Sequence, residues 1–203
     1  MDIKKDGEKM KKLVLFALLL CGTANAQNIT EMPSRLKTFT DNLGTVYASY
    51  TQTKTLPEST KTFSANGTVK FVKGVGFKWK QQKPNAFEFT STLDSYCIND
   101  DTQALSDLPY FSQIQSVIKD MLDGDMSSFI TAFDADYIED KKGQNWTLQA
   151  TPKISAIKDF LSSMTLAGNT KDLKQMVIAY KNGTMIIINF KRMKTESADE
   201  IKC

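Results

Sequence analysis

The sequence contains no histidine, and this absence removes several classes of enzyme. Histidine is the commonest general base and the commonest zinc ligand in proteins, so a Ser-His-Asp or Cys-His catalytic arrangement is impossible here. A glycine-rich phosphate loop is also missing, because Lys73-Gly74-Val75-Gly76 is too short and no helical pattern follows it. We therefore expect a protein that is not an enzyme.

Acidic residues are the remaining route to catalysis or metal binding. Two carboxylates from distant segments can meet in a fold and act as a hydrolase, and this alternative stays open although no local pattern supports it. The groups Asp100-Asp101 and Asp134-Ala135-Asp136 match no ordered calcium-loop pattern. We expect no catalytic residue, no bound metal and no cofactor.

The chain also has little excess charge, with 26 Lys and Arg against 23 Asp and Glu. The basic residues are dispersed, so we expect no nucleic acid partner. Internal repeats, low-complexity stretches and Pro/Gly-rich linkers are absent as well. A single domain, large enough to bury its own core, is therefore expected.

No apolar run approaches the roughly 20 residues that a membrane-spanning helix needs. A shorter run, Leu13 to Cys21, follows the basic Met10-Lys11-Lys12 and precedes Thr23-Ala24-Asn25-Ala26. This order of a positive start, an apolar stretch and small residues is typical of a secretory signal peptide. We predict that residues 1–26 are a signal peptide cleaved after Ala26.

Cleavage would leave residues 27–203 as one exported domain. A lipid anchor at Cys21 is the alternative, but the bulky Leu20 stands where that processing requires a small residue. Two cysteines, Cys97 and Cys203, would then remain, and an oxidising compartment permits a disulfide between them. Two unrelated thiols are the other possibility.

Helical spacing occurs at the start of this domain and in its middle. Met32, Leu36, Phe39 and Leu43 recur at steps of three and four, which predicts a helix that Gly44 ends. A second apolar helical stripe runs from Phe111 to Leu122. Gly124 interrupts it, and a shorter helical stretch is expected up to Phe133.

Between and after these helices the apolar pattern has a period of two, which predicts strands wet on one side, as in an antiparallel sheet or barrel. The expected strands begin at Val46, after Asn66-Gly67, near Phe77 and near Phe87, and continue with Trp146 to Pro152, Met164 to Leu166 and a hairpin around Asn182-Gly183. The predicted fold class is α+β, mainly antiparallel β, with a curled sheet covered by helices.

Aromatic and aliphatic side chains gather on the same faces of these strands. The set consists of Phe71, Phe77, Trp79, Phe87, Phe89, Met176 and Ile178. Such residues are often plain core, but aromatics and methionine also suit cavities that adapt to varied lipid chains. Composition alone leaves both interpretations open.

Several short stretches resemble the outer-membrane lipoprotein carrier (LolA-like) family. They are Tyr50-Thr51-Gln52-Thr53-Lys54-Thr55-Leu56, Phe63 to Phe71, Phe77-Lys78-Trp79, Lys83-Pro84, Met121 to Asp125, Asn145 to Leu148 and Leu166-Ala167-Gly168. No single stretch is specific, but their order and spacing cover essentially the whole chain after residue 26.

The resemblance implies an incomplete, half-open β-barrel whose apolar inner face is covered by helices. It implies a monomeric periplasmic carrier that sequesters acyl chains of lipoproteins or related lipids for transfer to the outer membrane. An inner-membrane release transporter and an outer-membrane receptor would be its partners. The alternative is a periplasmic lipid-sensing or acyl-product-binding module on the same fold, linked to a fatty-acid-type biosynthetic pathway.

The resemblance also implies a lid and a latch. We expect the stretch from residue 111 to 133 to cover the barrel mouth, with Gly124 as a joint and with Phe111, Ile114, Ile118, Leu122 and Phe129 facing inward. Lys73 occupies the position where classical carriers have an arginine that latches the lid, and Gly74 replaces the following proline. Lysine keeps the charge but lacks the planar fork of a guanidinium, so this latch is expected to be weaker.

Overall fold

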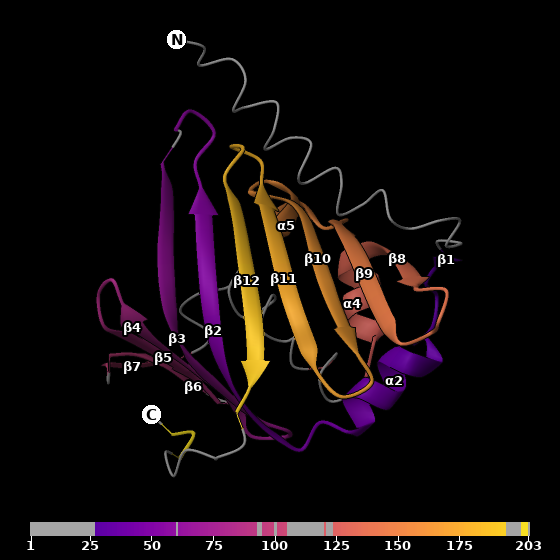
Figure 1. The fold of residues 1–203 in the computed structure, drawn as a ribbon, viewed down its shortest axis with the longest axis horizontal. Coiled ribbons are helices and arrows are strands. Elements are labelled where there is room, and N and C mark those ends of the chain that lie inside the picture. The colour runs from indigo at the N-terminus through magenta and orange to yellow at the C-terminus, as the bar shows by residue number, and fades with distance from the viewer. Residues whose placement is uncertain are drawn as a thin grey trace.

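The structure, a computed structural model, describes residues 27–59, 61–92, 95–99, 101–104, 120, 124–193 and 200–202. Its strands form one twelve-stranded antiparallel sheet in the order β1-β8-β9-β10-β11-β12-β2-β3-β4-β5-β6-β7 (Figure 1). The predicted class, α+β with a mainly antiparallel sheet in a half-open barrel, is confirmed. In the described part of the chain no helix is long and apolar enough to cross a membrane.

The first half of the chain supplies one side of the sheet and one helix. These elements are β1 (Gln27–Asn28), α2 (Ser34–Asp41), β2 (Thr45–Thr55), β3 (Thr62–Val72), β4 (Gly76–Lys83), β5 (Phe87–Ser91), β6 (Ser95–Ile98) and β7 (Asp101–Ala104). The second half adds α4 (Ser127–Ala132), β8 (Phe133–Glu139), β9 (Asn145–Pro152), α5 (Ser155–Lys158), β10 (Leu161–Asn169), β11 (Leu173–Tyr180) and β12 (Met185–Arg192). The hairpin predicted around Asn182-Gly183 is β11–β12.

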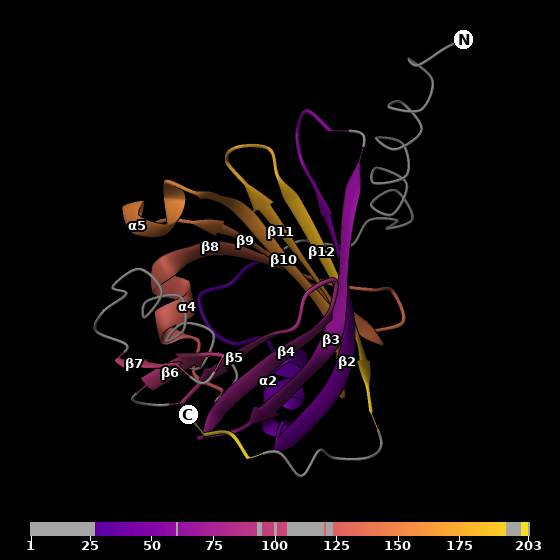
Figure 2. The same cartoon turned by 90° about the vertical axis from the view of Figure 1, so that its left-hand side faces the viewer.

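The sheet curls so that β8–β12 and β4–β7 form two walls joined through β2 and β3 (Figure 2). Cross-strand partners share a face, and the register therefore defines one continuous inner face. On this face Phe71 pairs with Val46 and Phe77, and Trp79 pairs with Val69 and Phe89. On the other wall Met176 pairs with Ile188 and Leu166.

Helix α2 closes one end of the curled sheet. Its apolar stripe buries Leu36 and Phe39 against the inner face, and the Phe39 ring lies 5.3 Å from that of Trp146. Its ends are bonded to turns at the same end of the sheet. Arg35 Nε pairs with Glu139 at 2.8 Å, and Asn42 Nδ2 donates to the Thr170 carbonyl at 3.1 Å.

Two predicted element boundaries are wrong. The strand expected after Asn66-Gly67 starts at Thr62 and passes through this dipeptide, with a register shift between the two residues. The helical stretch expected to reach Phe133 ends at Ala132, and Phe133 begins β8. In both places pairing with a neighbouring strand satisfies the backbone, which outweighs the local preference of the sequence.

Cys97 lies in β6, is 4% exposed and is disulfide-bonded. Cys21 and Cys203 both lie outside the residues that the structure describes, so the pairing of Cys97 with Cys203 in the exported chain stays a prediction.

Candidate functional site

The inner face of the sheet is divided into two regions that differ in burial. Over β8, β9 and β10 it is packed under α2 and α4, and its residues belong to the main core. Trp146 is 1% exposed there, Leu148 is fully buried and Leu166 is 2% exposed. Over β12, β4 and β5 the same face carries half-buried side chains such as Phe190, Trp79 and Phe89, although Tyr50 on β2 and Ile188 on β12 are buried.

Two groups of aromatic rings line this region, and each group contains one buried tyrosine, Tyr50 or Tyr96, beside half-buried rings. Trp79 lies 4.2 Å from Tyr50 and 6.2 Å from Phe190, measured between ring centroids. Phe89 lies 5.6 Å from Phe77 and 6.1 Å from Tyr96. We call Tyr50, Phe77, Trp79, Phe89, Tyr96 and Phe190 the aromatic row.

The cavity residues predicted from sequence all lie on the inner face, but in different surroundings. Phe77, Trp79 and Phe89 belong to the aromatic row. Phe71, Met176 and Ile178 are half-buried and pack against the edge of the main core. Phe87, at the start of β5, is 37% exposed. That these residues line a binding cavity stays a prediction.

Three members of the aromatic row, Tyr50, Tyr96 and Phe190, are not among the cavity residues predicted from the sequence. Tyr50 pairs directly with Phe190, and Tyr96 pairs with Ser91, which pairs with Phe77. The period of two from Tyr50 to Lys54 was visible in the sequence. Its register against β12 was not, because the two strands are far apart in the chain.

Gly67 allows the two rings of Tyr50 and Trp79 to meet across an intervening strand. It lies in β3 between Tyr50 and Gln81, and a Cβ at this position would overlap the Lys80 carbonyl oxygen and lie 2.9 Å from Gln81 Cα. Above this bare backbone, Trp79 Nε1 donates a hydrogen bond to the Tyr50 hydroxyl at 2.8 Å. Burial raises the pKa of Tyr50, so the hydroxyl stays protonated at neutral pH.

Substitution of Gly67 tests this close approach. Gly67→Ala should lower the free energy of unfolding by about 1–3 kcal/mol, the usual cost of forcing extra atoms into a packed region. The control is Gly44→Ala, because a Cβ at Gly44 meets nothing within 4 Å. Urea unfolding followed by circular dichroism measures both. Equal stability of the two variants would show that β3 and β4 are not tightly apposed at Gly67.

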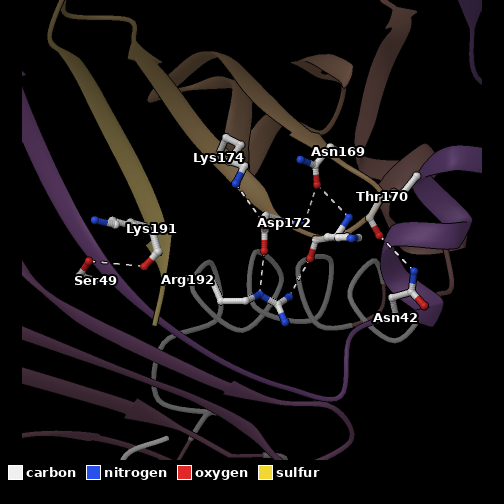
Figure 3. A network of polar contacts seen from close by, with 9 residues as sticks. Asn42, Ser49, Asn169, Thr170, Asp172, Lys174, Lys191 and Arg192 are labelled. Atoms are coloured by element: carbon white, nitrogen blue, oxygen red, sulfur yellow. Dashed lines mark hydrogen bonds and ion pairs between the residues drawn. The ribbon is translucent and has the colours of Figure 1, made fainter. Parts of the chain in front are cut away.

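A cluster of charged side chains lies at the end of the sheet closed by α2 (Figure 3). Arg192 Nε and Lys174 Nζ both contact the Asp172 carboxylate at 2.7 Å, and Arg192 also donates to the Lys171 carbonyl at 2.7 Å. Desolvation alone would raise the pKa of Asp172, but bonds and charges from Lys174 and Arg192 outweigh it and hold this pKa below its usual value. The cluster fixes the turn between β10 and β11 to the end of β12.

The predicted latch residue, Lys73, lies in the turn between β3 and β4. Its Nζ donates to the Thr40 carbonyl at 3.3 Å, near the end of α2, and its backbone N–H donates to the Gly44 carbonyl at 3.0 Å. Gly124 lies beside the same residue, since a Cβ there would be 3.7 Å from Thr40 Oγ1. Lys73 and the predicted joint therefore meet at Thr40, although a latching role is still a prediction.

Of the predicted lid residues, Phe111, Ile114, Ile118 and Leu122 lie outside the described residues. Phe129 lies in α4, is fully buried and stacks on Phe133 at a centroid distance of 5.1 Å. Gly124 has φ of +94°, a conformation that favours glycine. The part of the predicted lid after Gly124 thus belongs to the main core.

No group of three or more His, Cys, Asp or Glu side chains that could hold a metal occurs among the described residues. With its apolar inner face, the site is suited to binding an apolar ligand by exclusion of water.

Comparison with known families finds a match over residues 41–200 to the family described as outer membrane lipoprotein carrier protein LolA. Comparison with curated protein sequences finds no match. A LolA superfamily protein from Nitrosomonas europaea is a similar solved structure, with 9% identity, a TM-score of 0.41 and coverage of 81% of this chain and 93% of that one. A putative outer membrane lipoprotein-sorting protein domain from Vibrio parahaemolyticus has 12% identity, a TM-score of 0.37 and coverage of 81% and 94%.

Proposed function

Because this chain belongs to the outer membrane lipoprotein carrier protein LolA family, we propose that it carries acyl chains of lipoproteins or related lipids to the outer membrane. The acyl chains would lie on the aromatic row and the neighbouring residues Phe71, Phe87, Met176 and Ile178. Under this proposal residues 1–26 direct export and residues 27–203 work in the periplasm. The partners are a release transporter at the inner membrane and a receptor at the outer membrane.

The observation that supports this proposal most is the difference in burial across one sheet face. The residues over β8–β10 are nearly inaccessible, whereas Phe77, Trp79, Phe89 and Phe190 on β4, β5 and β12 keep part of their apolar surface exposed around the buried Tyr50. Covering apolar surface with a ligand is favourable, at about 0.8 kcal/mol for each CH₂ removed from water. A long acyl chain on this region would therefore be held firmly without any covalent step.

An acyl-probe titration tests the proposal. Phe89→Asp should weaken binding of a fluorescent fatty acyl probe by more than tenfold, since it places a carboxylate in the apolar row. Phe89→Ala, which adds no charge, should weaken it by a few-fold. Far-ultraviolet circular dichroism should remain that of a β protein in both variants.

The matched control is Thr51→Asp, which adds the same charge to the exposed outer face of β2. It should bind the probe as the wild type does. Wild-type affinity in both Phe89 variants would mean that the aromatic row is ordinary core, and the carrier proposal would then fail at this site.

A further inference from the structure

Lys54 differs from the other cations on the inner face. On β11, β12, β2 and β3, the inner positions carry three basic residues, Lys54, Lys174 and Arg192, and no carboxylate. Lys174 and Arg192 are both paired with Asp172, on the turn between β10 and β11. Among the described residues, Lys54 has no hydrogen bond and no ion pair.

The cross-strand neighbours of Lys54 are apolar. It pairs in register with Ile186 on β12 and Phe63 on β3, and Ile186 in turn pairs with Ile178. Lys54 and Ile186 are half-buried, whereas Phe63 is 52% exposed. An ammonium group among apolar side chains usually gains a partner or extends to water, and a bound anion would supply the partner that Lys54 lacks among the described residues.

Lys54 also lies at the end of the inner face that α2 does not close. β2 begins at Thr45, beside α2, and ends at Thr55, so Lys54 is at the far end of the strand (Figures 1 and 2). Lys54 lies four residues after Tyr50 of the aromatic row, which is about 13 Å along the strand. A ligand with its head at Lys54 would thus extend its chain past Gln52 and Ile188 to the aromatic row.

We propose that Lys54 binds the anionic head, a carboxylate or a phosphate, of a lipid whose acyl chain lies along the inner face toward the aromatic row. This inference rests on the proposed function and specifies its ligand. It predicts that a free fatty acid or a lysophosphatidate is held more tightly than a neutral lipid of equal chain length. Lys54 would select the head, and the aromatic row would hold the chain.

The test compares three probes with the same eighteen-carbon chain (roughly that of a membrane lipid): oleate, oleoyl lysophosphatidate and oleyl alcohol. Lys54→Met should lower the affinity for the anionic probes by about tenfold, as expected for one hydrogen bond between charged groups. Its affinity for oleyl alcohol should stay within about twofold of the wild type, as for a change that adds no apolar clash. Lys54→Arg should keep the binding of oleate.

Lys191→Met is the control, since it removes the same charge from an exposed position on the outer face of β12. It should leave all three affinities unchanged. Loss of only the carboxylate probe or only the phosphate probe would assign the head that Lys54 binds. Thermal unfolding of Lys54→Met checks that the variant is folded.

Equal weakening of all three probes, or none, in Lys54→Met would overturn the role of Lys54 while leaving the carrier function intact. Failure of the wild type to bind any of the three would instead overturn the proposed function, and the role of Lys54 with it. A preference of the wild type for oleyl alcohol would also contradict the proposed head site.

Discussion

Trp146→Ala should lower the free energy of unfolding by about 3–5 kcal/mol, the usual cost of removing a large buried aromatic side chain. Trp146 is 1% exposed, donates from Nε1 to the Asn169 carbonyl at 2.9 Å and packs against Phe39 of α2. It pairs with Gly168 on β10, where a Cβ would lie 2.7 Å from the indole. The residues around it cannot easily collapse into the space it leaves.

Trp79→Ala is the matched control, because the same side chain is removed from the other region of the same sheet face. Trp79 is half-buried, and its ring lies beside those of Tyr50 and Phe190. Its removal should cost about 1–2 kcal/mol of stability. Urea unfolding monitored by circular dichroism separates the two variants, and similar losses would contradict the division of the inner face into core and site.

Acyl binding should affect Trp79 more than Trp146, the reverse of their expected contributions to stability. The chain has two tryptophans, so each Trp→Phe variant leaves a single fluorescent reporter. In Trp146→Phe, the remaining Trp79 should change its emission when an acyl chain binds, because it lies in the proposed binding region. In Trp79→Phe, the remaining Trp146 should respond little, since α2 and the sheet already exclude water from it.

The spacing of apolar residues predicted the architecture well, because each helix or strand with regular spacing buries one face. The steps from Met32 to Leu43 predicted α2, and the alternation from Val46 predicted β2. β8 was missed although Phe133-Asp134-Ala135-Asp136-Tyr137 alternates clearly. The preceding Phe129 and Ile130 match helical spacing, which favoured a helix that reaches Phe133 over a strand that begins there.

Asn66-Gly67 shows where local sequence rules cannot decide. Asn-Gly is a strong turn signal because both residues accept positive φ. In the structure Gly67 is instead required for the close approach of β4, as its absent side chain would overlap Lys80. Such an approach depends on a strand elsewhere in the chain, so no local pattern distinguishes it from a turn.

The face of the candidate site was predictable from sequence, but its extent was not. A period of two places Phe77 and Trp79 together, and the same rule places Tyr50 with Lys54. Which half of the face is covered depends on where α2 and α4 pack. That packing brings Phe39 against Trp146, more than a hundred residues away in the chain. It also places Phe129 in a core built from distant strands. No short stretch of the sequence predicts these contacts, because their partners are far apart in the chain.

Hydrogen exchange should divide the predicted lid at Gly124. α4 buries Phe129, Ala132 and the adjacent Met126, and the Ala132 carbonyl accepts a hydrogen bond from Lys153 N–H at 2.8 Å. Amides of α4 should therefore exchange only through global opening, at least about 5 kcal/mol above the native state and thus slowed by roughly a thousandfold or more. Cargo should not change their protection beyond its effect on global stability.

Residues 111–123, in contrast, should exchange at least tenfold more slowly with an acyl cargo than without it, the response expected of a locally opening segment that cargo holds closed. This expectation follows from the sequence prediction that residues 111–133 form a lid with Gly124 as its joint, because the buried packing of α4 leaves the response to cargo to the part before Gly124. Exchange measured by mass spectrometry on peptides from either side of Gly124 gives the comparison directly. If both sides respond equally to cargo, Gly124 is not the joint.

Lys73 should then control how readily this segment opens, because its Nζ bonds to the Thr40 carbonyl beside Gly124. Lys73→Arg offers a planar fork that can bond several carbonyls and should slow cargo release, whereas Lys73→Leu should accelerate it. One hydrogen bond from a charged group, worth about 1.5–3 kcal/mol, corresponds to a change in release rate of roughly tenfold or more. Lys191→Leu, on the outer face, should release cargo at the wild-type rate, and equal rates in all these variants would show that Lys73 is not a latch.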